Sequence, residues 1–186
     1  PLVYEGRHIP VASLSAAAAE RTITVTATSK AFNTAGLKCA QMIFSNSADA
    51  QTWNGLTGVA KDGTGTLGVL AAETAYRECG SFLDEEVAYL RETRDWLVEE
   101  LPKRIPGLKT SKPEATYLLW LDFADTAIGG NPQPAKWLRE NAKVALNEGD
   151  TFGTGGPGHA RLNFSTSREI LEEALDRIER AFAALD

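Results

Sequence analysis

Two lysines that follow a short β-type run form the first pattern that suggests chemistry. The segment TATSKAFNTAGLKCA, residues 26–40, places Lys30 directly after Ser29 and Lys38 eight residues after Lys30. A lysine that bonds covalently to a carbonyl carbon must be held rigidly and kept partly deprotonated, which burial and a neighbouring cation both favour. A hydroxyl and a second cation nearby suit a phosphate group. The alternative is a solvated lysine at the end of a strand.

Two glycine-rich segments are further candidates for binding phosphate. Residues 63–68 (GTGTLG) fit the dinucleotide pattern GxGxxG, but that pattern requires a preceding strand and an acidic residue at the end of a second strand. WNGLTGVAKD precedes it here and Glu85 falls in a predicted helix, so nucleotide binding is disfavoured. Residues 153–158 (GTGGPG) lack the Lys-Ser or Lys-Thr pair of a P-loop, and we interpret them as a loop that places Arg161.

Other catalytic and metal-binding patterns are missing from the sequence. His8 and His159 are isolated, no serine lies in a GxSxG motif, and the two cysteines form no CxxC pair. Cys39 lies in an apolar run after the lysine segment, which favours a buried structural thiol. A zinc site and a disulfide framework are therefore disfavoured.

Strands are expected on both sides of the lysine segment. Residues 22–26 alternate polar and apolar β-branched side chains, the two-residue period of a strand, which should end near Ala27. A second short strand is predicted for residues 39–44 (CAQMIF), so that the lysines lie in a loop between two strands. Further strands are predicted for residues 116–123, 144–146 and 161–164.

Helical spacing of apolar residues predicts two consecutive helices in the middle of the chain. The first covers residues 67–79 and is expected to stop at Gly80. The second starts with Ser81 as its cap, carries acidic residues in its first turn, and should end where Pro102, Pro106 and Gly107 follow.

Two more helices are predicted in the last third of the chain. One begins at Asn131-Pro132, with Trp137 and Leu138 on its inner face. In the other, Thr166 and Glu169 are expected to form a capping box. Its apolar stripe consists of Leu171, Ala174, Leu175, Ile178, Phe182 and Leu185. This order of strands and helices, without internal repeats, predicts an α/β or α+β fold with a change of domain near residues 80–112.

Composition narrows the function classes. The 186 residues are 43% hydrophobic and 24% charged, as in folded globular domains. The net charge of −6, with no basic run longer than Lys103-Arg104, disfavours nucleic-acid binding. No apolar stretch approaches the ~20 residues of a membrane-spanning helix, and PLVYEGRHIP lacks signal-peptide features, so we expect a cytoplasmic protein. The apolar start without Met is typical of a sequence that begins inside a folded element.

The lysine segment, SKAFNTAGLK, resembles that of the fold type I pyridoxal 5′-phosphate (PLP) enzymes, the class I and II aminotransferases and their relatives. The asparagine in SKAFN and the following AGLKCA are most similar to the cystathionine β-lyases and C-S lyases of the MalY and PatB type. PLVYEGRHIPVASL resembles the stretch after that family's Asp-Glu-Ile-His motif, and HARLNFS resembles the segment with the arginine that binds the substrate carboxylate.

The resemblance implies an α/β PLP-dependent transferase fold and a division of the chain. Residues 1–80 would be the end of the large PLP-binding domain, residues 81–107 a long connecting helix, and residues 108–186 the small carboxyl-terminal domain. The family's full chain is about twice as long. Its first half, which supplies an aspartate for the pyridine nitrogen, an aromatic residue for the ring and a helix N-terminus for the phosphate, would precede Pro1.

The same resemblance assigns roles to four residues. Lys30 would form the Schiff base with PLP and carry the proton, Ser29 and Lys38 would approach the cofactor phosphate, and Arg161 would pair with the substrate α-carboxylate. Two departures concern phosphate affinity: Ala27 stands where the family often has serine, and Lys38 stands where aminotransferases have arginine. By resemblance, the GTGTLG segment would lie at a dimer interface near the neighbouring subunit's cofactor phosphate.

The expected function is β-elimination of a small sulfur amino acid by a homodimeric PLP enzyme of amino-acid metabolism, giving pyruvate, ammonia and a thiol. The chain by itself is expected to be inactive. An aminotransferase of the same fold is the first alternative, and it shares every residue named above. A non-catalytic α/β interaction domain whose behaviour ignores PLP is the second.

Overall fold

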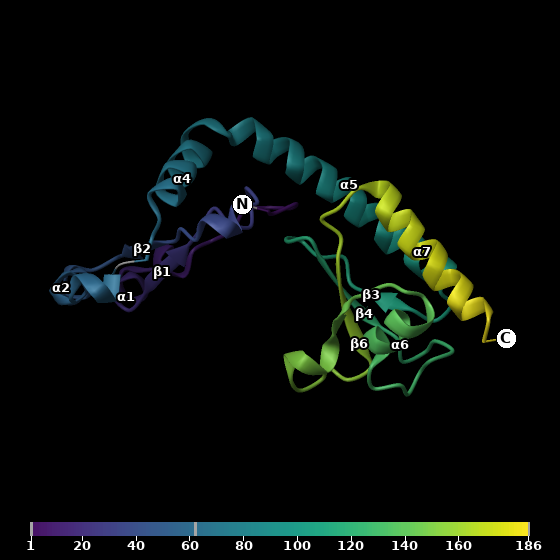
Figure 1. Cartoon of the computed structure of the whole chain (residues 1–186). Helices are drawn as coiled ribbons and strands as arrows, with labels where there is room; N and C mark the ends of the chain where they lie inside the picture. Colours follow the sequence, from purple (N-terminus) through teal and green to yellow (C-terminus); the bar gives the residue numbers. More distant parts are fainter. Residues whose placement is uncertain (1, 62, 186) are drawn as a thin grey trace. The chain divides into compact units, whose positions relative to one another are not determined.

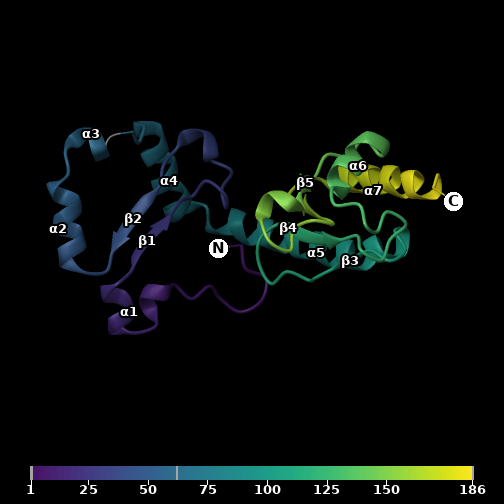
Figure 2. The ribbon, with the colours of Figure 1, turned by 90° about the horizontal axis from the view of Figure 1, so that it is seen from below.

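The computed structural model describes residues 2–61 and 63–185, which form two units (Figures 1 and 2). The amino-terminal unit contains Gly6–Glu86, and the carboxyl-terminal unit contains Leu2–Glu5 together with Val87–Asp186. Each unit is described by itself below. None of the helices in the described ranges combines the length and apolar character that a membrane crossing requires.

The amino-terminal unit is built around a two-stranded antiparallel sheet. Strand β1 (Ile23–Thr26) pairs with β2 (Gln41–Phe44), with Ile23 opposite Phe44 and Thr26 opposite Gln41. Strand β1 confirms the prediction from the alternating pattern, and β2 covers the last four residues of the second strand, which was predicted for residues 39–44. The loop between the two strands is also as predicted. The helices are α1 (Ala16–Glu20), α2 (Ser47–Gly55), α3 (Gly58–Lys61) and α4 (Thr66–Glu78), with short 3-10 turns at Val11–Ser13 and Ala35–Leu37.

Helices α1 to α3 were not predicted, because they are short and lack an apolar stripe. A capping signal for α2 is nevertheless present in the sequence. The Asn46 side chain accepts a hydrogen bond from the Asp49 backbone N–H at 2.8 Å, and Asp49 places a negative charge in the first turn.

Helix α5 (Gly80–Arg104) differs from its prediction at both ends. It begins at Gly80, so Gly80 does not merely stop α4 and Ser81 is not the cap. Pro102 lies inside the helix and does not end it. The helix continues because a proline disturbs only the turn before it, whereas the next turn closes normally through the bond from Ile105 N to Leu101 O at 3.0 Å. Leu101 and Ile105 are both buried, which fixes this last turn.

The carboxyl-terminal unit contains a four-stranded antiparallel sheet with the order β3-β4-β6-β5. The same unit contains most of α5 and all of α6 and α7. Helices α5 and α7 run close together in both views (Figures 1 and 2). Its elements beyond α5 are β3 (Lys109–Thr110), β4 (Leu118–Asp122), α6 (Pro134–Asn141), β5 (Asn147–Glu148), a 3-10 turn (Gly149–Phe152), β6 (His159–Asn163) and α7 (Arg168–Ala183).

The predicted strands at 116–123 and 161–164 are confirmed as β4 and β6, while residues 144–146 are not a strand. The short strand follows them instead, as β5. Helix α6 begins at Pro134, two residues beyond the predicted Pro132, because Pro134 occupies the first turn, where a missing N–H costs nothing. Its inner face is as predicted: Leu138 is buried and the Trp137 ring lies 5.1 Å from that of Phe182.

The capping box predicted for α7 is wrong. Ser167 is the N-cap residue, and the Thr166 backbone N–H bonds to the carbonyl of Phe164. Glu169 instead takes hydrogen bonds from its own backbone N–H and the Ser167 hydroxyl, which lower the pKa of its carboxyl group. Leu171, Leu175, Ile178 and Phe182 form the buried stripe, Ala174 is half-buried, and Leu185 is exposed.

Candidate functional site

Lys30 lies in a loop whose turns are closed by backbone hydrogen bonds. Beyond β1, Thr28 is buried, and its hydroxyl lies 3.0 Å from that of Thr34. The Phe32 backbone N–H donates to the Thr28 carbonyl at 2.9 Å, and the Thr34 N–H donates to the Ser29 carbonyl at 3.2 Å. These bonds close two successive turns around Lys30, so the lysine backbone is held while its side chain stays exposed.

Lys38 ends the same loop in an unusual conformation. It follows the 3-10 turn Ala35–Leu37 with φ 50° and ψ 52°, in the left-handed region that most residues avoid. Its N–H donates to the Ala35 carbonyl at 3.3 Å. Across residues 2–61 and 63–185, no ion pair or hydrogen bond engages the amines of Lys30 and Lys38, so both amines are available to a ligand.

Helix α4 supports this loop through a close contact at Gly68. A Cβ atom at Gly68 would overlap the carbonyl oxygen of Leu37 and lie 3.1 Å from the Cβ of Cys39. The third glycine of the GTGTLG segment therefore serves close packing of a helix against the lysine loop. Phe32, in the same loop, stacks 6.5 Å from Phe82 and meets Tyr76 edge-on at 6.4 Å.

Cys39 is not the buried strand residue that was predicted. It is half-buried and lies two residues before the start of β2, and its sulfur accepts a hydrogen bond from Gln41 Nε2 at 3.3 Å. The strand starts later than the apolar run CAQMIF predicts. Lys38 is in the left-handed conformation, so Cys39 and Ala40 return the chain to an extended path before strand pairing begins at Gln41.

Arg161 lies on β6 in the carboxyl-terminal unit. In the sheet it stands opposite Trp120 of β4 on one side and Asn147 of β5 on the other. Its Nη2 atom donates to Asn147 Oδ1 at 3.0 Å, and its Cζ atom lies 4.6 Å from the centre of the Phe152 ring. The Nε atom is shielded from solvent and has no hydrogen-bond partner within the described ranges.

These contacts leave Arg161 able to bind an anion. An unpaired buried donor costs roughly 1–3 kcal/mol, and a planar guanidinium pairs well with a carboxylate. No carboxylate of residues 2–61 and 63–185 lies within ion-pair distance of Arg161. The chemistry of the unpaired donors therefore suits a small carboxylate ligand.

Ser29, Lys30 and Lys38 thus lie in the segment between β1 and β2, and Arg161 lies in the other unit. Asn147 and Phe152, which hold the Arg161 guanidinium, were missed by the sequence reasoning. The sequence signal for them is weak: Phe152 is an apolar residue inside a glycine-rich loop, and Asn147 opens that loop.

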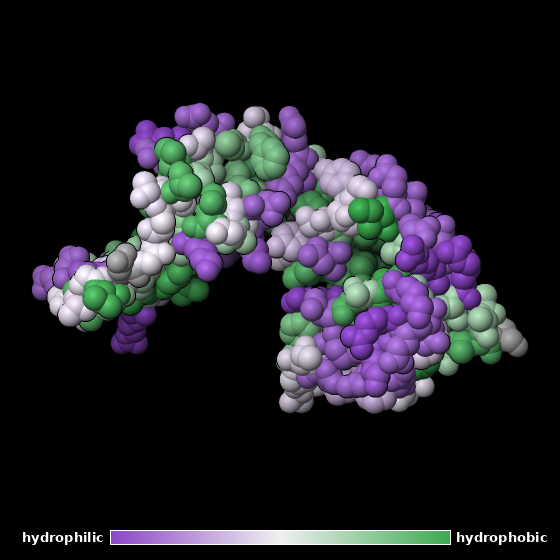
Figure 3. Space-filling view, viewed as in Figure 1, coloured by the Kyte–Doolittle hydropathy of each residue, from purple (hydrophilic) through white to green (hydrophobic). Residues whose placement is uncertain are grey.

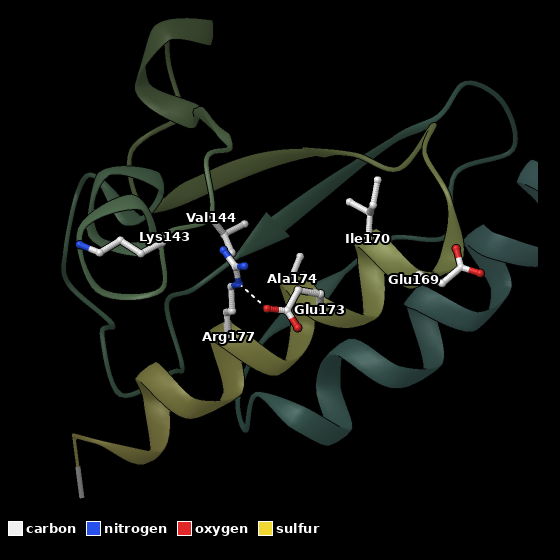
Figure 4. A pocket seen from close by; sticks show the side chains of 7 residues that line it. All are labelled: Lys143, Val144, Glu169, Ile170, Glu173, Ala174 and Arg177. Atoms are coloured by element: carbon white, nitrogen blue, oxygen red, sulfur yellow. Dashed lines mark hydrogen bonds and ion pairs between the residues drawn. The ribbon is translucent and has the colours of Figure 1, made fainter.

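One groove of the carboxyl-terminal unit offers no competing site. A groove along α7 is lined by Lys143, Val144, Glu169, Ile170, Glu173, Ala174 and Arg177 (Figure 4). Arg177 pairs with Glu173 on the same helix at 2.7 Å, and the Lys143 side chain extends away from them. The groove thus lacks converging polar groups. Within the ranges the structure describes, no group of three His, Cys, Asp or Glu residues is arranged to hold a metal ion.

Comparison with known proteins defines the family. Residues 2–178 match the family described as aminotransferase class I and II, and the chain belongs to this family. It is 53% identical over 178 residues, 96% of its length, to a cystathionine β-lyase of Corynebacterium glutamicum. It is 34% identical, over 98% of its length, to the cystathionine β-lyase PatB of Bacillus subtilis. The chain spans about half the length of these curated relatives, 47% of each.

Solved structures confirm the fold. A protein of Corynebacterium diphtheriae, proposed to be a PLP-dependent β-cystathionase, superposes with a TM-score of 0.93 at 54% identity, over 98% of this chain and 48% of its own. Cystalysin of Treponema denticola, whose structure contains pyridoxal 5′-phosphate, gives a TM-score of 0.88 at 29% identity, over 100% of this chain and 47% of its own. The resemblance drawn from the lysine segment is thus confirmed for the family and for the PLP-dependent aminotransferase fold.

Proposed function

We propose that the complete gene product containing this sequence is a PLP-dependent lyase that performs β-elimination on a sulfur amino acid. The observation that carries this proposal is the 53% identity, over nearly the whole chain, to a cystathionine β-lyase. The lysine loop supports it, because its exposed amines at Lys30 and Lys38 and the half-buried Ser29 match the donors that an aldehyde and a phosphate need. We further propose a cytoplasmic homodimer in which residues 1–80 belong to the large domain, 81–107 form the connecting helix, and 108–186 form the small domain.

The donor set fits PLP, which when bound would supply an electron sink for the carbanion at the substrate Cα. Lys30 would hold the aldehyde carbon of the cofactor, and its amine would accept the substrate Cα proton as a general base. The two turns around Lys30 hold its backbone, and its exposed amine is available for both tasks. The Ser29 hydroxyl and the Lys38 ammonium would bind the phosphate group. Because Lys38 offers a point charge and no planar fork, its phosphate contact would be less directional than that of an arginine.

Arg161 would bind the substrate α-carboxylate and so orient the bond from Cα to its proton. The electron pair of the broken Cα–H bond would form a double bond between Cα and Cβ as the sulfur leaves Cβ with the electron pair of the Cβ–S bond. The remaining three-carbon unit is hydrolysed to pyruvate and ammonia.

Selective labelling tests the Lys30 assignment. We expect that incubation with PLP, reduction with borohydride and peptide mapping will label Lys30 above the other lysines. Lys61, whose amine donates to the Asn54 carbonyl at 3.1 Å, is an internal reference for unspecific labelling. Lys30→Arg should remove the selective label and leave that at Lys61 unchanged. Equal labelling of Lys30 and Lys61 in the complete gene product would contradict the assignment, and behaviour that ignores PLP altogether would favour the non-catalytic interaction domain.

Product analysis tests the reaction. With cystathionine and the complete gene product, we expect pyruvate and a free thiol in equal amounts. Amino transfer to 2-oxoglutarate without release of thiol would instead establish the aminotransferase alternative.

Arg161→Ala should raise KM at least about tenfold, as expected when a charge-assisted pair is lost, and the matched surface substitution Arg180→Ala should not. An unchanged KM in Arg161→Ala would remove Arg161 from the substrate site.

A further inference from the structure

The Arg161 guanidinium is held by two neutral side chains. Asn147 Oδ1 accepts a hydrogen bond from Nη2 at 3.0 Å, which fixes the rotation of the guanidinium. The Phe152 ring lies 4.6 Å from Cζ and fixes the plane, because a cation prefers the face of an aromatic ring. Neither partner carries a charge, so the positive charge of Arg161 is positioned without being neutralised.

Phe152 is itself held in place. Its ring meets the edge of Trp120 at 5.5 Å, and Trp120 stacks on His159 at 5.4 Å. The loop around it is closed by Gly149 and Gly156, whose backbones lie so close that a Cβ atom on either would overlap the other's carbonyl oxygen. The 3-10 turn Gly149–Phe152 therefore presents the Phe152 ring to Arg161 from a fixed backbone.

We infer that Asn147 and Phe152 are positioning residues that set the affinity of Arg161 for the ligand carboxylate. This inference rests on the proposed function and extends it from Arg161 to the residues that orient it. The neutrality of Asn147 is its essential property. An aspartate at the same position would place a carboxylate within ion-pair distance of the guanidinium and compete with the ligand.

Carboxylate binding to the 186-residue chain tests this without cofactor or turnover. The probe is propionate, followed by ligand-observed NMR titration, with n-propanol as a control of similar shape that lacks the carboxylate. Wild-type protein should bind propionate more tightly than n-propanol, and Arg161→Ala should abolish the difference. Asn147→Asp should weaken propionate binding about tenfold, and Phe152→Leu roughly two- to fivefold, while n-propanol binding stays the same.

Two comparisons separate positioning from general damage to the fold. Phe152→Tyr keeps the aromatic face and should bind propionate like the wild type. In an Arg161→Ala background, Phe152→Leu should have no further effect. The inference is overturned by wild-type affinity in Asn147→Asp and Phe152→Leu, by weak binding in Phe152→Tyr, or by failure of the wild-type chain to prefer propionate.

Comparing the propionate titration with the borohydride labelling distinguishes a failure of the inference from a failure of the proposed function. Borohydride labelling reports on Lys30, which lies in the other unit, and does not depend on Arg161. Propionate binding that follows the expected order, without selective labelling of Lys30, would leave the inference standing and contradict the cofactor assignment. Selective labelling of Lys30, without the expected order of propionate binding, would support the cofactor assignment and contradict the inference.

Discussion

Arg94 shows what a single buried charge contributes to this fold. Its side chain is only 1% exposed, and the guanidinium donates to the Pro113 carbonyl and to Asp95 Oδ1, both at 2.8 Å. It also lies 4.5 Å from the centre of the Tyr4 ring and 3.5 Å from Glu5 Oε1. One residue of α5 thereby joins the segment Leu2–Glu5 to the remainder of the carboxyl-terminal unit.

Replacement of Arg94 by methionine should destabilise the carboxyl-terminal unit by about 2 kcal/mol, because the Pro113 carbonyl loses its donor in a buried place. The loss is smaller than for a fully buried ion pair, since both carboxylate partners are substantially exposed. Urea unfolding followed by tryptophan fluorescence measures it. Arg77→Met in α4, which breaks only an exposed pair with Glu73, should cost no more than about 0.5 kcal/mol. Equal losses in both variants would contradict the role of Arg94.

Glu86, on α5, predicts a dependence of stability on pH. Its Oε2 atom is shielded from solvent without a hydrogen-bond partner in the described ranges, and burial raises the pKa of its carboxyl group. The folded state therefore holds the proton more tightly than the unfolded state. Stability falls as the pH rises from the ordinary pKa through the raised one, and at neutral pH the ionised group is destabilising.

Glu86→Gln should accordingly unfold at a higher temperature than the wild type at pH 7. The two proteins should converge below about pH 4, where the carboxyl group is protonated in both states. Melting curves across this pH range measure the difference. The exposed neighbour substitution Glu85→Gln is the control, and a Glu86→Gln gain that does not vary with pH would contradict the explanation by burial.

At the scale of elements, the contact between α4 and the lysine loop leaves no room for a side chain at Gly68. Gly68→Ala should destabilise the amino-terminal unit by roughly 1–3 kcal/mol, because the new methyl group meets the Leu37 backbone. This loss exceeds the gain of about 1 kcal/mol that alanine brings to a helix interior. Selective PLP labelling of Lys30 should fall in the same variant.

The matched control for Gly68→Ala is Gly80→Ala, at the start of α5, where the added methyl group has no atom of the described residues within 4 Å apart from its chain neighbours and its own helix backbone. It should leave stability unchanged or raise it slightly. A Gly68→Ala protein as stable as Gly80→Ala, measured by urea unfolding, would show that the helix and the loop adjust independently.

The elements that the sequence predicts well are those with a clear period. Strand β1 alternates, β4 is continuously apolar, and α7 has a full stripe, so each was predicted close to its observed place. Boundaries failed where backbone geometry decides, as at Gly80, which begins a helix, and at Ser167, which replaces Thr166 as the cap. The short strand at Asn147–Glu148 has no period of its own, because its pairing with β6 alone defines it.

The candidate site was predictable only in part for the same reason. Lys30, Ser29, Lys38 and Arg161 came from resemblance to a family, and no spacing rule would have joined the first three to the fourth. Asn147 and Phe152 become visible only when β5 and the following turn fold beside β6. Contacts across strands and loops depend on tertiary register, which a linear pattern does not contain.

At the scale of the whole molecule, the two units differ in how their apolar residues are covered. On α4 of the amino-terminal unit, Leu67 is 71% exposed and Leu70 is 60% exposed. Figure 3 shows apolar residues in green on the surface near α4, and a mostly hydrophilic face on the carboxyl-terminal unit. Exposed apolar patches of this kind promote association.

The 186-residue chain should therefore self-associate as its concentration rises, measured by sedimentation velocity. Replacing Leu67 and Leu70 together by glutamate should shift the protein toward the monomer and leave its circular dichroism spectrum unchanged. Ile170→Glu, an exposed apolar position on α7, is the control and should have little effect. Persistent association in the double variant would place the contact elsewhere.

The discontinuous composition of the carboxyl-terminal unit has a consequence for synthesis of the protein. Leu2–Glu5 leave the ribosome before the rest of that unit, yet their partners are Arg91, Arg94 and the residues around Ala115, where Val3 pairs. Chains fold largely as they emerge, and contacts between residues far apart in sequence form late. The segment Leu2–Glu5 must wait through the translation of the entire amino-terminal unit, so that on a ribosome stalled before residue 115 Val3 would lack Ala115, its partner in the β-bridge.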